Sequence, residues 1–65
     1  MPIVEITLIE GRSREAKTRL MKKVTEAVVE AIDAKPESIR VILREIPGEH
    51  FAIAGVAKGK PSAAS

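Results

Sequence analysis

Apolar and polar positions alternate along residues 3–9, near the start of the chain. Val4, Ile6 and Leu8 share one face of this segment, and the opposite face mixes isoleucine with polar residues. Such alternation, together with many β-branched side chains, predicts a β-strand. Since neither face is wholly polar, we expect both to be covered, one by a helix and the other by another subunit.

The apolar spacing changes to a helical period from Arg14 to about Asp33. Ser13 precedes this segment as a suitable N-cap. Pro36 closes it, because the residue before a proline is pushed out of helical geometry. A helix of that length spans roughly 30 Å, enough to cover a sheet and return the chain to its starting edge. The predicted apolar stripe consists of Ala16, Leu20, Val24, Ala27, Val28 and Ala31, with Met21 and Ile32 beside it.

Alternation returns over residues 39–46 and predicts a second strand. Val41 and Leu43 share one face, and the two arginines, Arg40 and Arg44, share the other. Strand, crossover helix and strand form a βαβ unit, so we expect parallel strands and a right-handed crossover. Two parallel strands make a poor sheet by themselves, which again indicates a partner chain.

The remainder of the chain is short and rich in turn-forming residues. Pro47 and Gly48 give a turn signal, and residues 50–56 predict a hairpin or an arm that adds to a neighbour's sheet. We therefore expect an α+β fold in which residues 1–56 form one βαβ domain with a short C-terminal hairpin. Residues 57–65 are small and polar, and we expect them to form a flexible C-terminal tail.

The composition makes assembly into an oligomer the expected source of stability. A chain of 65 residues with 45% hydrophobic residues is too apolar for a disordered protein. A core of this size rarely supplies more than roughly 3–5 kcal/mol without disulfides, a metal or oligomerisation. The chain has no cysteine and a single histidine, His50, which excludes disulfides, thiolate zinc sites and histidine clusters. Oligomerisation remains, and we expect it to be obligate.

Charge and aromatic content exclude several classes of partner. Phe51 is the only aromatic residue, whereas base-stacking nucleic-acid modules need several. The net charge of +2 is small and mixed along the chain, so there is no basic stripe for a phosphate backbone. No apolar run approaches the roughly 20 residues of a membrane span, and no signal peptide is visible. We expect a cytoplasmic protein that binds neither nucleic acid nor membranes.

Pro2 is the most informative candidate for chemistry. Removal of the initiator Met1 would leave Pro2 as the N-terminus, with a secondary amine that no internal residue can imitate. The reference pKa of a terminal amine is about 7.7–8.0, and apolar burial and nearby guanidinium groups both lower it. The neutral amine would act as a general base. While Met1 remains, the Pro2 nitrogen is an amide and no such base exists.

Arg12, Arg40 and Arg44 are candidates to share a site with Pro2. In a parallel pair, Arg40 at the start of the second strand approaches Pro2 at the start of the first. Arg12 follows the first strand and lies roughly 30 Å from Pro2, at about 3.3 Å per residue. If both arginines serve one site, Arg12 must come from another chain. Because arginine binds carboxylates bidentately, the set suits a small acid with one or two carboxylates and a proton to be moved.

Several of these side chains also have simpler interpretations. Any one of the arginines is compatible with an ordinary solvated charge. Phe51 and Ile53 suit either the wall of an apolar pocket or core packing. His50 suits a turn or the surface, and Glu5 and Glu45 suit surface or interface charges.

Four short segments follow one another at definite separations from the N-terminal proline. They are residues 2–3 (PI), 8–13 (LIEGRS), 38–42 (SIRVI) and 50–55 (HFAIAG). Together they resemble the 4-oxalocrotonate tautomerase family of the tautomerase superfamily, over nearly the whole chain except the tail. The resemblance implies a β-α-β subunit assembled as a homohexamer. It also implies an isomerase of aromatic hydrocarbon catabolism that uses no cofactor or metal.

The resemblance implies roles for individual residues as well. Pro2 would be the base that takes a proton from the dienol 2-hydroxymuconate and returns it at a distant carbon. Arg12 would bind the far carboxylate. Arg40, from a neighbouring subunit, would hold the carboxylate and oxygen beside the reacting end. An apolar wall that keeps the pKa of the amine low would consist of Phe51 with Ile9 and Ile53 beside it.

Two alanines depart from the pattern of the family. Ala52 and Ala54 stand where the better-known members tend to carry glycine, so two added methyl groups near the pocket would narrow it. This difference leaves the natural substrate open. Two other functions stay open as well: a non-catalytic assembly or binding module with the same fold, and a relative with hydratase, dehalogenase or Michael-addition activity.

Overall fold

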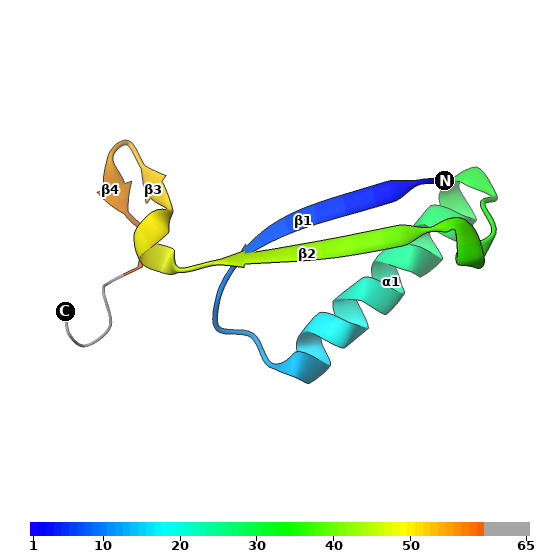
Figure 1. The fold of residues 1–65 in the computed structure, drawn as a ribbon, viewed down its shortest axis with the longest axis horizontal. Coiled ribbons are helices and arrows are strands. Elements are labelled where there is room, and N and C mark those ends of the chain that lie inside the picture. Colours follow the sequence, from blue (N-terminus) through cyan, green and yellow to red (C-terminus); the bar gives the residue numbers. More distant parts are fainter. Residues whose placement is uncertain (60–65) are drawn as a thin grey trace.

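Two long parallel strands with one helix against them, and a small hairpin beyond the end of the sheet, make up the chain (Figure 1). The computed structural model describes residues 1–59; residues 60–65, part of the predicted tail, lie outside the described residues. The elements in chain order are β1 (Ile3–Ile9), α1 (Arg14–Ile32), the 3-10 turn η1 (Pro36–Ser38), β2 (Arg40–Ile46), the 3-10 turn η2 (Gly48–His50), β3 (Ala52–Ile53) and β4 (Val56–Ala57).

The two long strands pair in parallel, as the βαβ pattern predicts. Their register runs from Ile3 opposite Arg40 to Ile9 opposite Ile46. β2 begins one residue later than the sequence indicates, because Ile39 is the C-cap of η1 and its N–H donates to the carbonyl of Pro36 at 3.1 Å. The parallel register places both amino ends of the strands together at one end of the molecule.

Helix α1 begins at the predicted N-cap and ends at Ile32, before the predicted stop at Pro36. The hydroxyl of Ser13 accepts a hydrogen bond from the N–H of Ala16 at 3.1 Å, which caps the first turn. Asp33 ends the helix in the left-handed conformation, with φ of 58°, and its N–H donates to the carbonyl of Val29 at 2.9 Å.

Among residues 1–59, no helix has both the length and the apolar character needed to cross a membrane. The cytoplasmic location stays a prediction.

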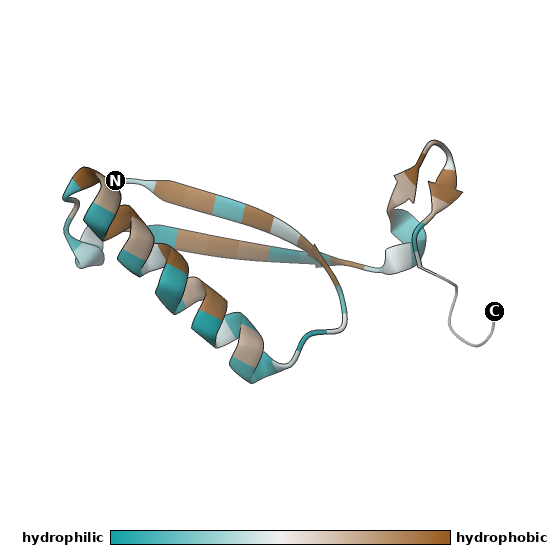
Figure 2. Cartoon of the chain, turned by 180° about the vertical axis from the view of Figure 1, so that it is seen from behind, coloured by the Kyte–Doolittle hydropathy of each residue, from teal (hydrophilic) through white to brown (hydrophobic). Residues whose placement is uncertain are grey.

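The half-buried face of α1 differs from the predicted stripe. Ala27, Ala31 and Ile32 are exposed, whereas Met21 is half-buried as predicted and Val29, which was not predicted, is half-buried as well. A sheet of two strands is too narrow to cover the whole stripe, so part of it faces outward from the isolated subunit. The helix lies against one face of the sheet only (Figure 2), and the other face is uncovered.

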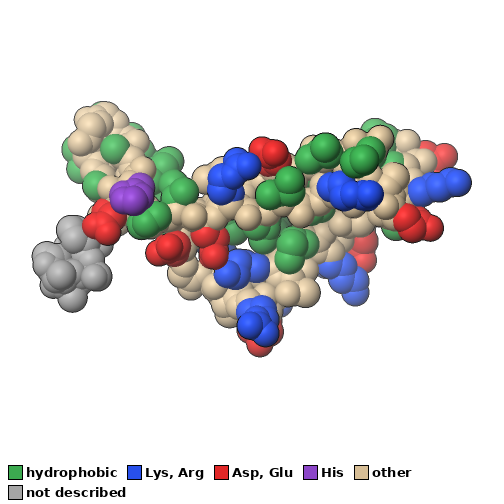
Figure 3. Space-filling model, viewed as in Figure 1, with side chains coloured by type: hydrophobic (Ala, Val, Ile, Leu, Met, Phe, Trp, Pro, Cys, Tyr) green, Lys and Arg blue, Asp and Glu red, His purple; other side chains and the backbone are tan. Residues whose placement is uncertain are grey.

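The subunit has almost no core of its own. Ile39, 9% exposed, is the one buried hydrophobic side chain in the described part of the chain. The radius of gyration is 15.2 Å, against about 11 Å for a compact domain of this length. Apolar side chains lie at the surface over the strands and the hairpin (Figure 3); the large exposed ones are Met1, Ile3, Ile32, Ile42, Phe51, Ile53 and Val56. So much exposed apolar surface is typical of a site of contact with another protein chain.

The C-terminal hairpin is longer than the sequence predicts. β3 and β4 pair antiparallel around a two-residue turn in which Ala54 has φ of 53° and Gly55 has φ of 84°. Beyond β4, the N–H of Lys58 donates to the carbonyl of Phe51 at 2.6 Å, and the N–H of Gly59 donates to the carbonyl of Gly48 at 3.1 Å. Residues 57–59, which the sequence assigned to the tail, are therefore hydrogen-bonded parts of the hairpin.

Replacement of Ala54 by glycine is expected to stabilise the protein by about 0.5–1 kcal/mol, because a Cβ is unfavourable in the left-handed conformation. The thermal unfolding midpoint should rise at a fixed protein concentration, which matters for an oligomer. Ala52→Gly is the matched control. Ala52 lies in β3 with an ordinary φ, so glycine there should lower the midpoint. A lower midpoint for Ala54→Gly as well would contradict the strain at this turn.

Candidate active site

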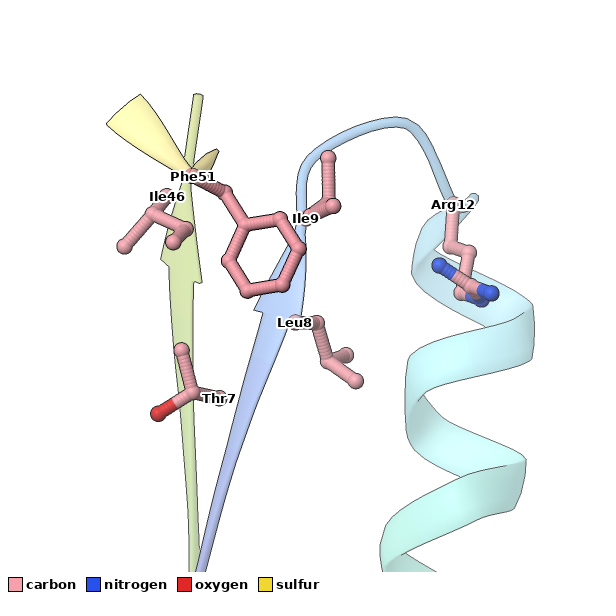
Figure 4. Close-up of a pocket in the computed structure, with 6 residues that line it drawn as sticks. All are labelled: Thr7, Leu8, Ile9, Arg12, Ile46 and Phe51. Carbon is pink, nitrogen blue, oxygen red and sulfur yellow. The ribbon is translucent and has the colours of Figure 1, made fainter. Parts of the chain in front are cut away.

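An open hollow at the carboxyl end of β1 gathers three of the predicted site residues. Its volume is about 330 Å³, within the range of small-molecule sites. The ring of Phe51 lies beside Ile9 and Ile46, and Arg12 comes from the segment that leads into α1 (Figure 4). The full lining is Thr7, Leu8, Ile9, Arg12, Ile46 and Phe51. One side of the hollow is therefore apolar and the other carries a guanidinium group.

Arg12 is the arginine that lines this hollow. It follows Gly11, whose φ of 131° turns the chain away from β1, and its side chain is exposed. Within residues 1–59, no carboxylate lies within ion-pairing distance of Arg12. Arg44 differs, because its Nη1 atom lies 3.4 Å from a carboxylate oxygen of Glu5. Arg12 is therefore a candidate to bind a ligand, whereas Arg44 already pairs with the carboxylate of Glu5.

Two backbone hydrogen bonds fix the position of Phe51. Pro47 leads from β2 into η2, and this turn ends with the N–H of Phe51 donating to the carbonyl of Gly48 at 3.1 Å. The carbonyl of Phe51 accepts from the N–H of Lys58. The side chain remains 39% exposed, so the ring forms one wall of the hollow and still presents surface to an incoming group.

Pro2 and Arg40 meet at the opposite end of the sheet. The N–H of Arg40 donates to the carbonyl of Pro2 at 3.0 Å, as the expected approach of the two strand starts requires. The Nη1 atom of Arg40 donates to the carbonyl of Glu37 at 2.8 Å. Pro2 is half-buried, whereas Met1 is 77% exposed. The guanidinium group of Arg40 keeps further N–H groups for a ligand, since arginine carries five.

The predicted site residues therefore fall into two groups within one subunit. Pro2 and Arg40 lie at one end of β1, and Ile9, Arg12 and Phe51 lie at the other, roughly 20 Å away along the strand. Ile53 joins neither group. It is 59% exposed on β3, away from the lining of the hollow.

Some residues that line the hollow were not predicted from the sequence. Thr7 shares a strand face with Ile9, so the alternation of β1 was the signal that could have found it. Ile46 pairs with Ile9 across the sheet, which depends on the register. The charged residues judged less important behave as surface groups: Glu45 pairs with Lys17 at 3.0 Å, and His50 is exposed at the end of η2.

A small βαβ subunit whose apolar hollow is also lined by an arginine is suited to an enzyme for small anionic substrates. The model of the tautomerase enzyme family matches residues 2–60. The chain belongs to this family and is an isomerase, as the motifs at Pro2, Arg12 and Arg40 predict.

Individual relatives agree with this assignment. A probable tautomerase of Ralstonia nicotianae is 48% identical over 58 residues, which cover 89% of this chain and 83% of the relative. A 2-hydroxymuconate tautomerase of Stutzerimonas stutzeri is 47% identical over 55 residues, covering 85% and 87%. The solved structure of a heterohexamer 4-oxalocrotonate tautomerase from Chloroflexus aurantiacus matches with a TM-score of 0.86 and 33% identity, covering 89% of this chain and 94% of that one. The predicted fold, with parallel strands and a C-terminal hairpin, is confirmed.

Proposed function

We propose that this chain is a tautomerase for a small unsaturated oxo or hydroxy acid such as 2-hydroxymuconate, with the Pro2 amine as general base. The observation that carries the proposal is the hollow that Arg12, with no ion-pair partner within residues 1–59, lines together with the apolar Ile9 and Phe51. A flat carboxylate needs both a cationic end and an apolar wall. The 2-hydroxymuconate tautomerase at 47% identity supports this choice of substrate, which would place the enzyme in aromatic-ring degradation.

The chemistry is a proton transfer that requires no other reactant. After removal of Met1, the neutral Pro2 amine takes the proton from the dienol hydroxyl. The double bonds shift, and the protonated amine returns the proton to a distant carbon, so that a conjugated oxo acid forms. Met1 is 77% exposed, so the bond that must be cleaved lies at the surface of the subunit.

The two arginines would hold opposite ends of the substrate. Arg12 binds the far carboxylate. Within one subunit, Arg40 contacts Pro2 through its main-chain N–H, and its Nη1 atom donates to the Glu37 carbonyl. The Arg40 guanidinium group that binds the carboxylate and oxygen beside the reacting end would therefore come from a neighbouring subunit. The hydrogen bond that Nη1 of Arg40 donates to the Glu37 carbonyl would fix the orientation of the Arg40 guanidinium group. Negative charge develops on the oxygen during proton transfer, so Arg40 acts where the transition state needs a donor.

A homohexamer would join the two groups of residues into one site. Pro2 and Arg12 lie at opposite ends of β1, so a neighbouring subunit must bring them together. The uncovered face of the sheet and the exposed hairpin supply the apolar surface for such contacts. In that assembly, Phe51 and Ile53 would belong to the apolar wall that keeps the pKa of the Pro2 amine low.

Arg12→Ala and Arg40→Ala are each expected to lower kcat/KM for a dicarboxylate by about 10²-fold, since hydrogen bonds to charged groups contribute roughly 1.5–3 kcal/mol. Arg12→Ala should mainly raise KM, because Arg12 binds the unreactive end of the substrate. Arg40→Ala should mainly lower kcat, because charge develops near it. Arg44→Ala is the matched control, since Arg44 pairs with Glu5 and lines no part of the hollow. Wild-type kinetics in both folded variants would refute the carboxylate clamp.

The Met1-free protein should convert 2-hydroxymuconate with an acidic limb of the pH–rate profile at or below about pH 7, below the reference pKa of a terminal amine. The reason is that an apolar wall and two guanidinium groups disfavour the protonated amine. Steady-state rates from pH 5 to 9 measure the limb. No turnover of any enol acid by protein verified by mass to lack Met1 would overturn the proposed function.

A further inference from the structure

Two glycines make a close backbone contact at the base of the hairpin. A Cβ built on Gly48 would lie 2.8 Å from the Cα of Gly59, and a Cβ built on Gly59 would lie 2.7 Å from the Cα of Gly48. Neither glycine has a positive φ, unlike Gly11 and Gly55. The need for glycine at this crossing is therefore a matter of space, because no side chain fits between the two backbone segments.

Hydrogen bonds converge on the same point. The carbonyl of Gly48 accepts from the N–H of Phe51 and from the N–H of Gly59, both at 3.1 Å. The carbonyl of Phe51 in turn accepts from the N–H of Lys58. A Cβ on Gly48 would also lie 3.6 Å from Cγ2 of Ile9, so the crossing adjoins the hollow. The position of the Phe51 backbone thus depends on how closely the two glycines approach.

We propose that Gly48 and Gly59 form a glycine clasp that positions the Phe51 ring in the hollow. The clasp closes the arm of residues 51–58 against the end of the sheet, and both backbone hydrogen bonds of Phe51 lie next to it. This inference rests on the proposed function, in which Phe51 is part of the apolar wall beside the amine. A Cβ at Gly48 requires a shift of roughly half an ångström or more, and a misplacement of about 1 Å in a site can cost about 10²-fold in rate.

Gly48→Ala is expected to lower kcat/KM by about 10-fold. It should also move the acidic limb of the pH–rate profile to higher pH, because a displaced ring desolvates the Pro2 amine less and lets its pKa rise. Loss of folded enzyme would lower the rate without moving the limb. Glu49→Ala is the matched control, since Glu49 is exposed, lines no part of the hollow and already carries a Cβ.

The comparison with Phe51→Ala shows whether the clasp acts through the ring. Gly48→Ala combined with Phe51→Ala should lose no more activity than Phe51→Ala alone, because both changes remove the same interaction. If Phe51→Ala moves the limb and Gly48→Ala does not, the clasp is overturned and the proposed function stands. If Phe51→Ala leaves rate and limb unchanged, the wall assigned to Phe51 in the proposed function fails instead.

Amide hydrogen exchange on the wild-type protein tests the clasp independently of activity. The amide of Lys58 should be protected, and a cross-peak should connect the α-protons of Gly48 and Gly59. Gly48→Ala or Gly59→Ala should remove the protection of Lys58, and Glu49→Ala should keep it. An unprotected Lys58 amide in the folded wild-type oligomer, or protection that survives both glycine substitutions, would overturn the proposal even if no variant showed measurable turnover.

Discussion

Retention of Met1 is expected to lower turnover by at least about 10²–10⁴-fold, the usual contribution of general acid–base catalysis. The Pro2 nitrogen is then an amide without useful basicity, although every other group of the site is present. Pro2→Ala should reduce the rate without abolishing it, because a primary amine remains in nearly the same place. Preparations with and without Met1, separated and verified by mass, are compared on the same enol acid.

The outcome separates two accounts of this chain. Equal activity of the Met1-retaining and the processed protein would show that Pro2 is not the base. The family fold would then serve as a binding or assembly module, or would use another proton acceptor. A large difference between the two preparations, with equal sedimentation of both, assigns the loss to the amine itself rather than to assembly.

Ile42→Glu is expected to prevent assembly and with it all turnover. Ile42 is 42% exposed on the face of the sheet that α1 leaves uncovered; it lies opposite Glu5 and diagonal to Ile3, which is 58% exposed. An unpaired charge buried in a subunit contact costs about 3–5 kcal/mol. The isolated subunit buries only Ile39 among the described residues, so it has little hydrophobic core to keep it folded once assembly fails. Sedimentation velocity and circular dichroism measure assembly and folding together.

A charge change elsewhere serves as the control for this variant. Lys22→Glu reverses a charge on the exposed side of α1 and should leave sedimentation and turnover as in the wild type. A wild-type protein that sediments as a folded monomer at micromolar concentration would contradict the homohexamer. It would also leave Pro2 and Arg12 at opposite ends of β1 with nothing to join them.

The sequence predicted most accurately those elements that depend on local signals. The alternation of residues 3–9 matches β1, and Ser13 caps the helix at the expected position. The exposure of Ala27 and Ala31 was missed because the width of the sheet that covers α1 depends on the fold and not on the helical period. A periodic pattern reports which residues share a face, and the structure reports how much of that face has a partner.

Features that depend on contacts between distant residues were less predictable. The hairpin continues to Gly59 because Gly48 accepts its N–H, and nothing in the composition of residues 57–59 reveals that bond. Ala54 adopts a left-handed conformation that favours glycine or asparagine, so its residue type gave a misleading signal. In the site, the rise per residue of the first strand was enough to place Arg12 and Pro2 at its opposite ends. The pairing of Arg44 with Glu5 needed the cross-strand neighbours.

The most direct test of an active site shared between subunits is to mix two inactive variants. Met1-retaining protein lacks the base and Arg12→Ala lacks the ligand for the far carboxylate, so at a substrate concentration well below KM neither should turn over 2-hydroxymuconate appreciably. In hybrid oligomers assembled from equal amounts, about one site in four should combine an intact Pro2 with an intact Arg12 from another chain. We expect activity to return to roughly that fraction of the wild type. Hybrids confirmed by mass that stay as inactive as their parents would contradict an active site built between subunits.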